Sequence, residues 1–149
     1  MMSIKFQKHT GNPNDFMQIL PLDWQEALQM VWDDAKATSE IYVIKEDGNI
    51  IAGGILFKQY TLEMALFKQE AEALLAKHSY YIGYLWVNET HRGRDLGTLW
   101  LDSVKSSYPN TKFWLTIEEE NLKNFYLKND FHVAKEVENG GIKEWLLAC

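Results

Sequence analysis

The stretch WVNETHRGRDLGTLW, residues 86–100, contains residue types that could bind an anion. Arg92, Gly93, Arg94 and Gly97 follow an apolar run and precede apolar residues at helical spacing. The first amides of a helix have no partner within the helix, and the positive end of the helix dipole lies beside them. Glycine lets a phosphate approach the backbone and lets the turn take positive φ. The stretch therefore predicts a phosphate site at the start of a helix that begins near residue 95.

Asp95 places a carboxylate inside this predicted site. At roughly 6 Å from a phosphate charge, it would weaken binding by about 0.7 to 3 kcal/mol for effective dielectric constants between 80 and 20. Arg92 and Arg94 could offset much of this repulsion. Two arrangements stay open. Either Asp95 faces away and the site binds with some penalty, or its carboxylate accepts hydrogen bonds from the same amides and closes the site.

The elements that must position this motif follow from hydrophobic periodicity and turn residues. Strands are expected at residues 3–9, 41–45, 50–57, 80–87, 112–117, 131–137 and 142–148, and helices at residues 21–37, 61–78, 95–106 and 121–129. Asp47-Gly48 and Asn139-Gly140-Gly141 are expected to turn two hairpins, and Asp23 to cap the first helix. The order predicts a mixed α/β (α+β) fold, with about seven strands in one sheet, helices on both faces and an extra helix between strands three and four.

In the extra helix, apolar residues share one face and Glu63 lies outside it. The apolar face consists of Met64, Phe67, Ala71, Leu74 and Leu75. This helix could roof a ligand pocket or form the interface of a homodimer.

The bulk composition limits the function. With 149 residues, 46% of them hydrophobic, the chain is expected to form one domain over residues 1–149. A net charge of −6 argues against nucleic acid and membrane surfaces as partners. The one cysteine is Cys149, so neither an intrachain disulfide nor a cysteine metal cluster is expected, and the scattered histidines predict no metal site. No secretory signal or apolar run of about 20 residues stands out, and we expect a cytoplasmic protein.

The segment LWVNETHRGRDLG resembles the acyl-CoA-binding signature of the GNAT superfamily of N-acetyltransferases, through Leu85, Val87, Arg92, Asp95 and Gly97. The segment YLKNDF, residues 126–131, is similar to the tyrosine and glycine-phenylalanine that commonly end the last helix in that family. The element order is similar as well, so the resemblance covers nearly the whole chain. It implies a mostly antiparallel sheet and acetyl-CoA as co-substrate.

The resemblance also implies roles for individual residues. The CoA pyrophosphate would bind the backbone around Arg92, Gly93, Arg94, Asp95, Leu96, Gly97 and Thr98. Trp86, Val87 and Asn88 would contact the pantetheine arm where the sheet splays open, and an amide near Val87 would polarise the thioester carbonyl. Tyr126 would protonate the departing thiolate.

Three positions depart from the family pattern. Asp95 and Asp130 stand where the family usually has glycine; at Asp130 the usual reason is a left-handed helix end, which aspartate tolerates. Asn121 precedes Tyr126 by five residues instead of seven, which rotates it by about 140° around the helix. Asn121 is therefore either a cofactor contact or only the helix cap.

The expected reaction is acetyl transfer from acetyl-CoA to a primary amine of a small molecule, directly and within a ternary complex. The amine must lose a proton, and Glu89, His91, Tyr81 and Tyr84 are unranked candidates to accept it. The acidic charge balance suits a cationic acceptor such as a polyamine or an aminoglycoside-like molecule. The alternative is a non-catalytic domain of the same fold, in which Asp95 weakens CoA binding and the domain serves binding or assembly.

Overall fold

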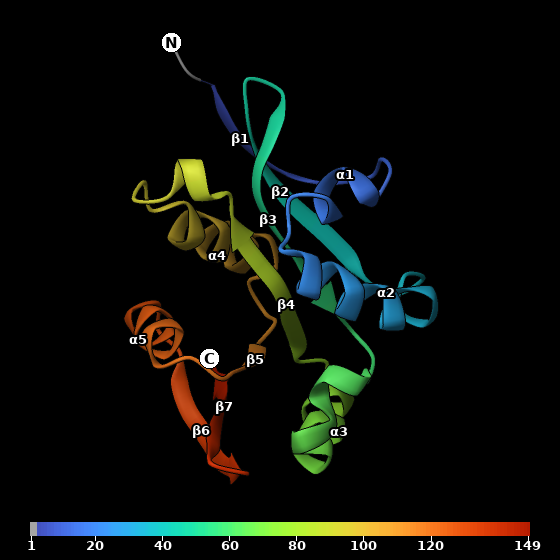
Figure 1. Cartoon of the computed structure of the whole chain (residues 1–149), viewed down its shortest axis with the longest axis vertical. Helices are drawn as coiled ribbons and strands as arrows, with labels where there is room; N and C mark the ends of the chain where they lie inside the picture. The colour runs from blue at the N-terminus through green and yellow to red at the C-terminus, as the bar shows by residue number, and fades with distance from the viewer. Residues whose placement is uncertain (1–2) are drawn as a thin grey trace.

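A seven-stranded sheet forms the centre of the computed structural model, which describes residues 3–149 (Figure 1). The strands lie in the order β1-β2-β3-β4-β5-β7-β6, and all neighbours are antiparallel except β4 and β5. Their bounds are β1 Ile4–Lys8, β2 Glu40–Glu46, β3 Asn49–Phe57, β4 Tyr80–Val87, β5 Phe113–Ile117, β6 His132–Asn139 and β7 Ile142–Ala148. The predicted mixed, mostly antiparallel sheet is confirmed.

Turn residues account for both hairpins. Asp47 and Gly48 have φ values of 50° and 86°, and Gly140 and Gly141 have 61° and 85°. A two-residue hairpin turn with both central residues at positive φ matches the right-handed twist of the strands. The two predicted hairpins, β2–β3 and β6–β7, are therefore confirmed.

The helices follow the predicted order, except that α1 and η2 are additional and the second predicted helix is divided. Their bounds are α1 Asn14–Met17, α2 Leu22–Ala35, η1 Leu62–Phe67, α3 Lys68–Ala76, η2 Glu89–His91, α4 Leu96–Ser107 and α5 Glu120–Lys128, where η marks a 3₁₀ helix. The one-turn helix α1 was not predicted, because Gly11 and Pro13 indicate a chain break. The predicted helix 61–78 is divided at Phe67, whose φ of −119° and ψ of 40° are not helical. Asp23 lies in the first turn of α2 and makes no capping bond, so its prediction as the cap is wrong.

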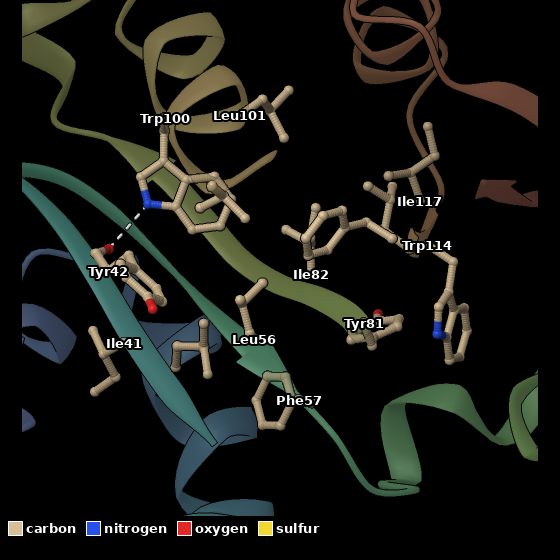
Figure 2. Close-up of a cluster of buried hydrophobic side chains, with 14 of the residues drawn as sticks. Ile41, Tyr42, Leu56, Phe57, Tyr81, Ile82, Trp100, Leu101, Trp114 and Ile117 are labelled. Carbon is tan, nitrogen blue, oxygen red and sulfur yellow. Dashed lines mark hydrogen bonds between the residues drawn. The ribbon is translucent and has the colours of Figure 1, made fainter. Parts of the chain in front are cut away.

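Adjacent glycines in β3 show which helices cover which face. A Cβ on Gly53 would lie 2.6 Å from the ring of Phe16 in α1, and a Cβ on Gly54 would lie 2.6 Å from the ring of Trp100 in α4. Successive residues of a strand point to opposite faces, so α1 and α4 cover opposite faces of the sheet. The indole of Trp100 is buried and donates to the Tyr42 carbonyl at 3.0 Å, which anchors α4 to β2 (Figure 2).

Candidate active site

The sheet separates where β4 meets β5. The two strands pair only at Tyr80 with Phe113 and at Tyr81 with Trp114, although β4 continues to Val87 and β5 to Ile117. Beyond these two pairs, no strand of residues 3–149 pairs with the β5-facing edge of β4. We call this region, β4 and β5 beyond Tyr81 and Trp114, the strand divergence.

Backbone direction places donors along that edge. The Asn88 amide donates to the Ile51 carbonyl at 2.8 Å, which makes Val87 and Ala52 a non-hydrogen-bonded pair. In such a pair the backbone groups of both residues point away from the partner strand. The amide and carbonyl of Val87 therefore point toward the β5 side, where the carbonyl accepts a hydrogen bond from Arg92 Nε at 3.2 Å.

A β-bulge interrupts β4 at Tyr84. Gly53 pairs with Trp86 and Ile55 with Gly83, so Gly54 alone stands opposite two residues of β4. Tyr84 has φ of 57°, which is uncommon for a residue with a side chain. The bulge keeps the rings of Tyr84 and Trp86 together on the α2 face, at centroid distances of 6.0 and 5.2 Å from Trp24. The aromatic and branched content of residues 80–87 predicts a strand and does not reveal this bulge.

The start of α4 presents free backbone amides. The first hydrogen bond of the helix runs from the Leu99 amide to the Asp95 carbonyl at 2.9 Å, so the amides of Leu96, Gly97 and Thr98 have no acceptor within it. Asp95 is exposed and its carboxylate makes no capping hydrogen bond. Of the two arrangements left open by the sequence, the structure has the one in which the amides stay free.

Backbone conformation explains why glycine is usual at position 95. Asp95 has φ of 57° and ψ of 27°, the left-handed region that glycine enters without strain and aspartate tolerates. Gly93 also has positive φ, 79°, and a Cβ there would meet nothing within 4 Å. Gly97 is different, because its φ is not positive and a Cβ would lie 2.9 Å from the Phe125 ring of α5. The expectation that Gly97 supplies positive φ is wrong; it lets α4 pack against α5.

Both arginines of the motif already have partners. Arg94 forms a two-point ion pair with Glu46 at the end of β2, and His91 Nε2 lies 3.6 Å from the same carboxylate. The Arg94 hydrogen bond holds the pKa of Glu46 below its usual range. The guanidinium of Arg92 lies 4.4 Å from the centre of the Trp86 ring. Arg94 therefore offsets less of the Asp95 charge than the sequence predicts, and Glu46, 48 residues away, has no sequence signal that links it to Arg94.

Tyr126 lies on α5, on the same side of the sheet as α4. Its side chain is 6% exposed, and burial raises the pKa of its hydroxyl. The helix ends in a Schellman motif, in which the Phe131 amide donates to the Tyr126 carbonyl at 3.1 Å and Asp130 has φ of 70°. The predicted left-handed residue at Asp130 is confirmed. Asn121 is exposed in the first turn and the cap position is Glu119, so the prediction of Asn121 as the cap is wrong.

The sequence of the chain matches a known protein family. Residues 13–131 match the sequence model of the acetyltransferase (GNAT) family. The chain belongs to this family. No curated protein matches it in sequence.

Solved GNAT structures share the fold of this chain at low sequence identity. A GNAT family protein from Desulfovibrio desulfuricans superimposes with a TM-score of 0.74 at 10% identity, over 99% of this chain and 98% of that one. A GNAT family acetyltransferase from Elizabethkingia anophelis, solved with acetyl-CoA bound, gives 0.61 at 16% identity, over 97% and 95%. An aminoglycoside 6′-N-acetyltransferase complexed with coenzyme A gives 0.68 at 12% identity, over 97% and 96%.

The donors of this GNAT domain fit the chemistry of coenzyme A. A diphosphate requires several convergent N–H donors, which the first turn of α4 provides beside the open space at Gly93. An amide-containing arm requires an unpaired strand edge, which β4 provides beyond Tyr81. In residues 3–149, no helix is both long and apolar enough to cross a membrane.

The four candidate proton acceptors lie in different surroundings. Glu89 is exposed in η2, and His91 faces Glu46. The ring of Tyr84 packs edge-on against Trp24, and its buried hydroxyl has no hydrogen-bond partner within residues 3–149. Tyr81 is buried at the strand divergence, where its hydroxyl shares a hydrogen bond of 3.0 Å with Thr116 Oγ1 of β5. The four groups therefore do not form one cluster.

Sequence reasoning missed another ionisable group near Tyr81. One carboxylate oxygen of Glu63, Oε1, is fully buried and has no hydrogen-bond partner in residues 3–149. The α-helical spacing assumed for residues 61–78 places Glu63 away from the buried face, whereas residues 62–67 form a 3₁₀ helix. The available signal was a single charge in the apolar run LEMALF.

Proposed function

We propose that this GNAT domain is an N-acetyltransferase that transfers the acetyl group of acetyl-CoA to a primary amine of a small molecule, directly and within a ternary complex. One observation carries the proposal: the unpaired edge of β4 lies beside the free amides of α4. These two sets of donors suit the two ends of one extended ligand, a phosphate group and an amide-containing arm.

The proposed cofactor contacts follow from these donors. The amides of residues 92–98 would bind the pyrophosphate, and Trp86, Val87 and Asn88 would bind the pantetheine arm. Asn121 is proposed as a further contact from the first turn of α5. Arg92 would act from its place on the Trp86 ring, where its charge remains close to the strand edge.

The proposed chemistry needs two hydrogen-bond donors, one for the carbonyl oxygen of the thioester and one for its sulfur. Acetyl-CoA, when bound, supplies the acetyl group as an activated thioester. The Val87 amide would polarise the carbonyl while the amine nitrogen forms the new N–C bond. The C–S bond breaks, its electron pair goes to sulfur, and the Tyr126 hydroxyl donates to that sulfur. Burial keeps Tyr126 protonated, which suits a donor.

The acceptor class has separate support. The aminoglycoside 6′-N-acetyltransferase of the same fold acts on a cationic small molecule, and this chain carries a net charge of −6. An acidic protein attracts a cationic acceptor over distances comparable with the Debye length. We therefore propose a small cationic amine as the acceptor.

Thermal unfolding during an acetyl-CoA titration tests the proposal, with CoA and ADP as matched controls. A ligand that binds only the folded state raises its apparent stability by about 2.7 kcal/mol at 100 times its Kd. We expect a saturable rise in Tm with acetyl-CoA and with CoA, and a smaller one with ADP, which lacks the pantetheine arm. A well-folded sample with no rise at saturating acetyl-CoA would exclude the proposed enzyme.

A second function, binding or assembly without catalysis, is favoured by the local charges. Glu46 takes up the charge of Arg94, and Asp95 adds a negative charge beside the free amides. This alternative predicts weak or absent CoA binding, so the same titration separates the two.

A further inference from the structure

Glu63 is a partly buried residue whose carboxylate has one oxygen enclosed by the protein and without a partner in residues 3–149. It lies in η1, directly after β3, and its Oε1 atom is fully buried with no hydrogen bond from any residue of 3–149. An unpaired buried charge is costly unless a ligand or a proton satisfies it. A purely structural role would be served better by a neutral side chain. We therefore expect the Glu63 carboxylate to bind a proton or a ligand reversibly.

Tyr81 connects Glu63 to the strand divergence. The negative charge of Glu63 raises the pKa of Tyr81, so the two side chains lie within electrostatic reach of each other. Tyr81 is half of the last β4–β5 pair, its ring packs 4.7 Å from Trp114, and its hydroxyl reaches Thr116 on β5. Glu63 thus lies beside the point where the sheet opens.

Side chains from both faces of the sheet lie near the strand divergence. Tyr81 and Trp114 point to the side of α3, whereas Ile117 points to the opposite side, where Trp100 of α4 covers the sheet (Figure 2). Tyr126 comes from α5, yet it also raises the pKa of Tyr81 from across the sheet. Glu63 and Tyr126 therefore approach the strand divergence from opposite faces.

We propose that the Glu63 carboxylate faces the acceptor amine and takes its proton, and that the acceptor is a primary amine that arrives as an ammonium ion. This inference rests on the proposed acetyl transfer. The acceptor enters on the α3 side, and the donor thioester meets Tyr126 on the other. In the transfer, the ammonium gives one proton to Glu63, the neutral amine forms the N–C bond, and the thiolate leaves with a proton from Tyr126. The second proton of the nitrogen restores Tyr126, and Glu63 returns its proton to solvent.

The ionisation of Glu63 suits this exchange. Burial raises its pKa to about 7, so at neutral pH it can both accept and release a proton. Among residues 3–149, the ionisable groups that act on the pKa of Tyr81 are Glu63, Tyr126 from α5 and Glu144 from β7, and Glu118, after β5, acts on Glu144. Burial, with the nearby Glu118 carboxylate, also raises the pKa of Glu144. Lys135 of β6 is paired with Glu70 of α3 at 2.8 Å. The carboxyl groups of Glu63, Glu118 and Glu144 therefore favour a cationic acceptor over an anionic one.

Steady-state acetyl transfer tests the role of Glu63, with a panel of primary amines that includes spermidine, kanamycin and benzylamine. The variants are Glu63→Gln, which removes the charge at equal size, Glu63→Asp, which keeps it on a shorter arm, and Glu72→Gln, an exposed control on α3. We expect Glu63→Gln to lower kcat/KM for the amine at least 100-fold at pH 7, Glu63→Asp to keep part of the activity, and Glu72→Gln to match the unmodified protein. The rise in Tm with acetyl-CoA should be unchanged in all three.

The pH profile separates a proton acceptor from a residue that only shapes the site. The unmodified protein should gain activity as pH rises through about 7 and then level off. Glu63→Gln should lack that step and rise tenfold per pH unit up to the pKa of the amine itself, because only the free amine then reacts. An unchanged profile and kcat/KM in Glu63→Gln would overturn the role of Glu63 and leave the acetyltransferase standing. Absence of an acetyl-CoA shift in the unmodified protein would overturn both. An acetyl-CoA shift without acetylation of any amine would overturn the acceptor class and the role of Glu63.

Discussion

Burial raises the pKa of both Glu63 and Tyr126, but it leaves the two residues in different states near neutral pH. A phenol ordinarily titrates near pH 10, so a further rise only keeps Tyr126 protonated and available as a donor. A carboxyl ordinarily titrates near pH 4, so a rise to about 7 makes Glu63 change charge at physiological pH. The same physical cause thus keeps the proposed donor protonated and lets the proposed acceptor change charge.

Glu63 should make the stability of the protein depend on pH. Its folded pKa of about 7 exceeds its usual 4.5, so between these values the folded state holds a proton that the unfolded state has lost. Stability therefore falls as pH rises from about 4.5 to about 7 and is constant above that. At about 1.4 kcal/mol per unit, the cost at pH 8 is at most about 3 kcal/mol. Urea unfolding should find Glu63→Gln more stable than the unmodified protein at pH 8, by up to that amount, with the difference shrinking toward pH 4.5.

The exposed residue Glu72 provides the control for this titration. Glu72→Gln removes the same charge from the same region of the chain, so a general effect of net charge would appear in both variants. A Glu63→Gln difference that does not vary with pH would show that Glu63 is not buried in its charged form. This measurement needs no ligand and is independent of the reaction.

Tyr126→Phe separates proton donation from cofactor binding. The ring still packs against Phe131, at a centroid distance of 5.4 Å, and only the hydroxyl is lost. We expect kcat to fall by about 10²- to 10⁴-fold while acetyl-CoA raises Tm as before. Phe125→Leu, which changes the neighbouring ring on Gly97, controls for disturbed packing of α5. Unchanged turnover in Tyr126→Phe would remove this hydroxyl from the mechanism.

The start of α4 combines a charge and a backbone conformation in one residue, Asp95. Asparagine tolerates the left-handed region as aspartate does but carries no charge, whereas glycine changes both properties. Because Asp95 is exposed, its repulsion of a phosphate roughly 6 Å away lies near the high-dielectric limit. Calorimetry should find acetyl-CoA binding about threefold tighter in Asp95→Asn at low salt, with the gain reduced at 1 M salt.

The variant Asp95→Gly tests whether the backbone conformation at residue 95, in addition to its charge, limits the affinity for acetyl-CoA. Affinity equal to that of Asp95→Asn would assign the whole effect to the carboxylate. Tighter binding in the glycine variant alone would assign it to the backbone of the loop. A gain of tenfold or more in both variants would favour the binding or assembly function over the enzyme, because the native residue would then hold the site nearly closed.

Local sequence patterns were enough to predict most helices and strands. Features that depend on contacts between distant residues were not predicted. Asp47-Gly48 and Gly140-Gly141 mark their turns because few other residues adopt two successive positive φ values, so both hairpins follow from sequence. The glycine-rich start of α4 and the helix around Tyr126 could be located in the same way. The bulge at Tyr84 depends on the register between β3 and β4, and no local pattern reports that register.

The backbone of the proposed cofactor side could be predicted from sequence, whereas the grouping of side chains on the proposed acceptor side could not. A phosphate site uses backbone amides at a helix start, which consecutive residues such as Gly93 and Leu96 define. The acceptor side depends on which side chains meet across the sheet. Glu63, Tyr81 and Thr116 belong to three elements, and their meeting requires the tertiary fold. The ion pair of Arg94 with Glu46 escaped prediction for the same reason.

Across the whole molecule, the sheet consists of two parts with a short junction. Strands β1 to β4 form one part and β5 to β7 the other, and only two residue pairs join them. Helix α4 packs on the first part, and the contact of Gly97 with Phe125 connects it to α5 near the second. The ion pair between Glu70 of α3 and Lys135 of β6 connects the parts again. A ligand in the strand divergence would therefore add contacts at the weakest junction of the sheet.

Hydrogen–deuterium exchange with and without acetyl-CoA should locate those contacts. Amides that lack a hydrogen bond exchange fast, so labelling must begin below one second to see residues 85–88 and 92–98. We expect acetyl-CoA to slow exchange in both segments, because the ligand would accept hydrogen bonds from β4 and from the start of α4. The hairpin turn at Gly140-Gly141 lies on the far side of β5 and should exchange equally in both samples. Protection in residues 92–98 without protection in 85–88 would place a phosphate at α4 but no thioester arm along β4. The strand divergence would then lose its assignment as the reaction site.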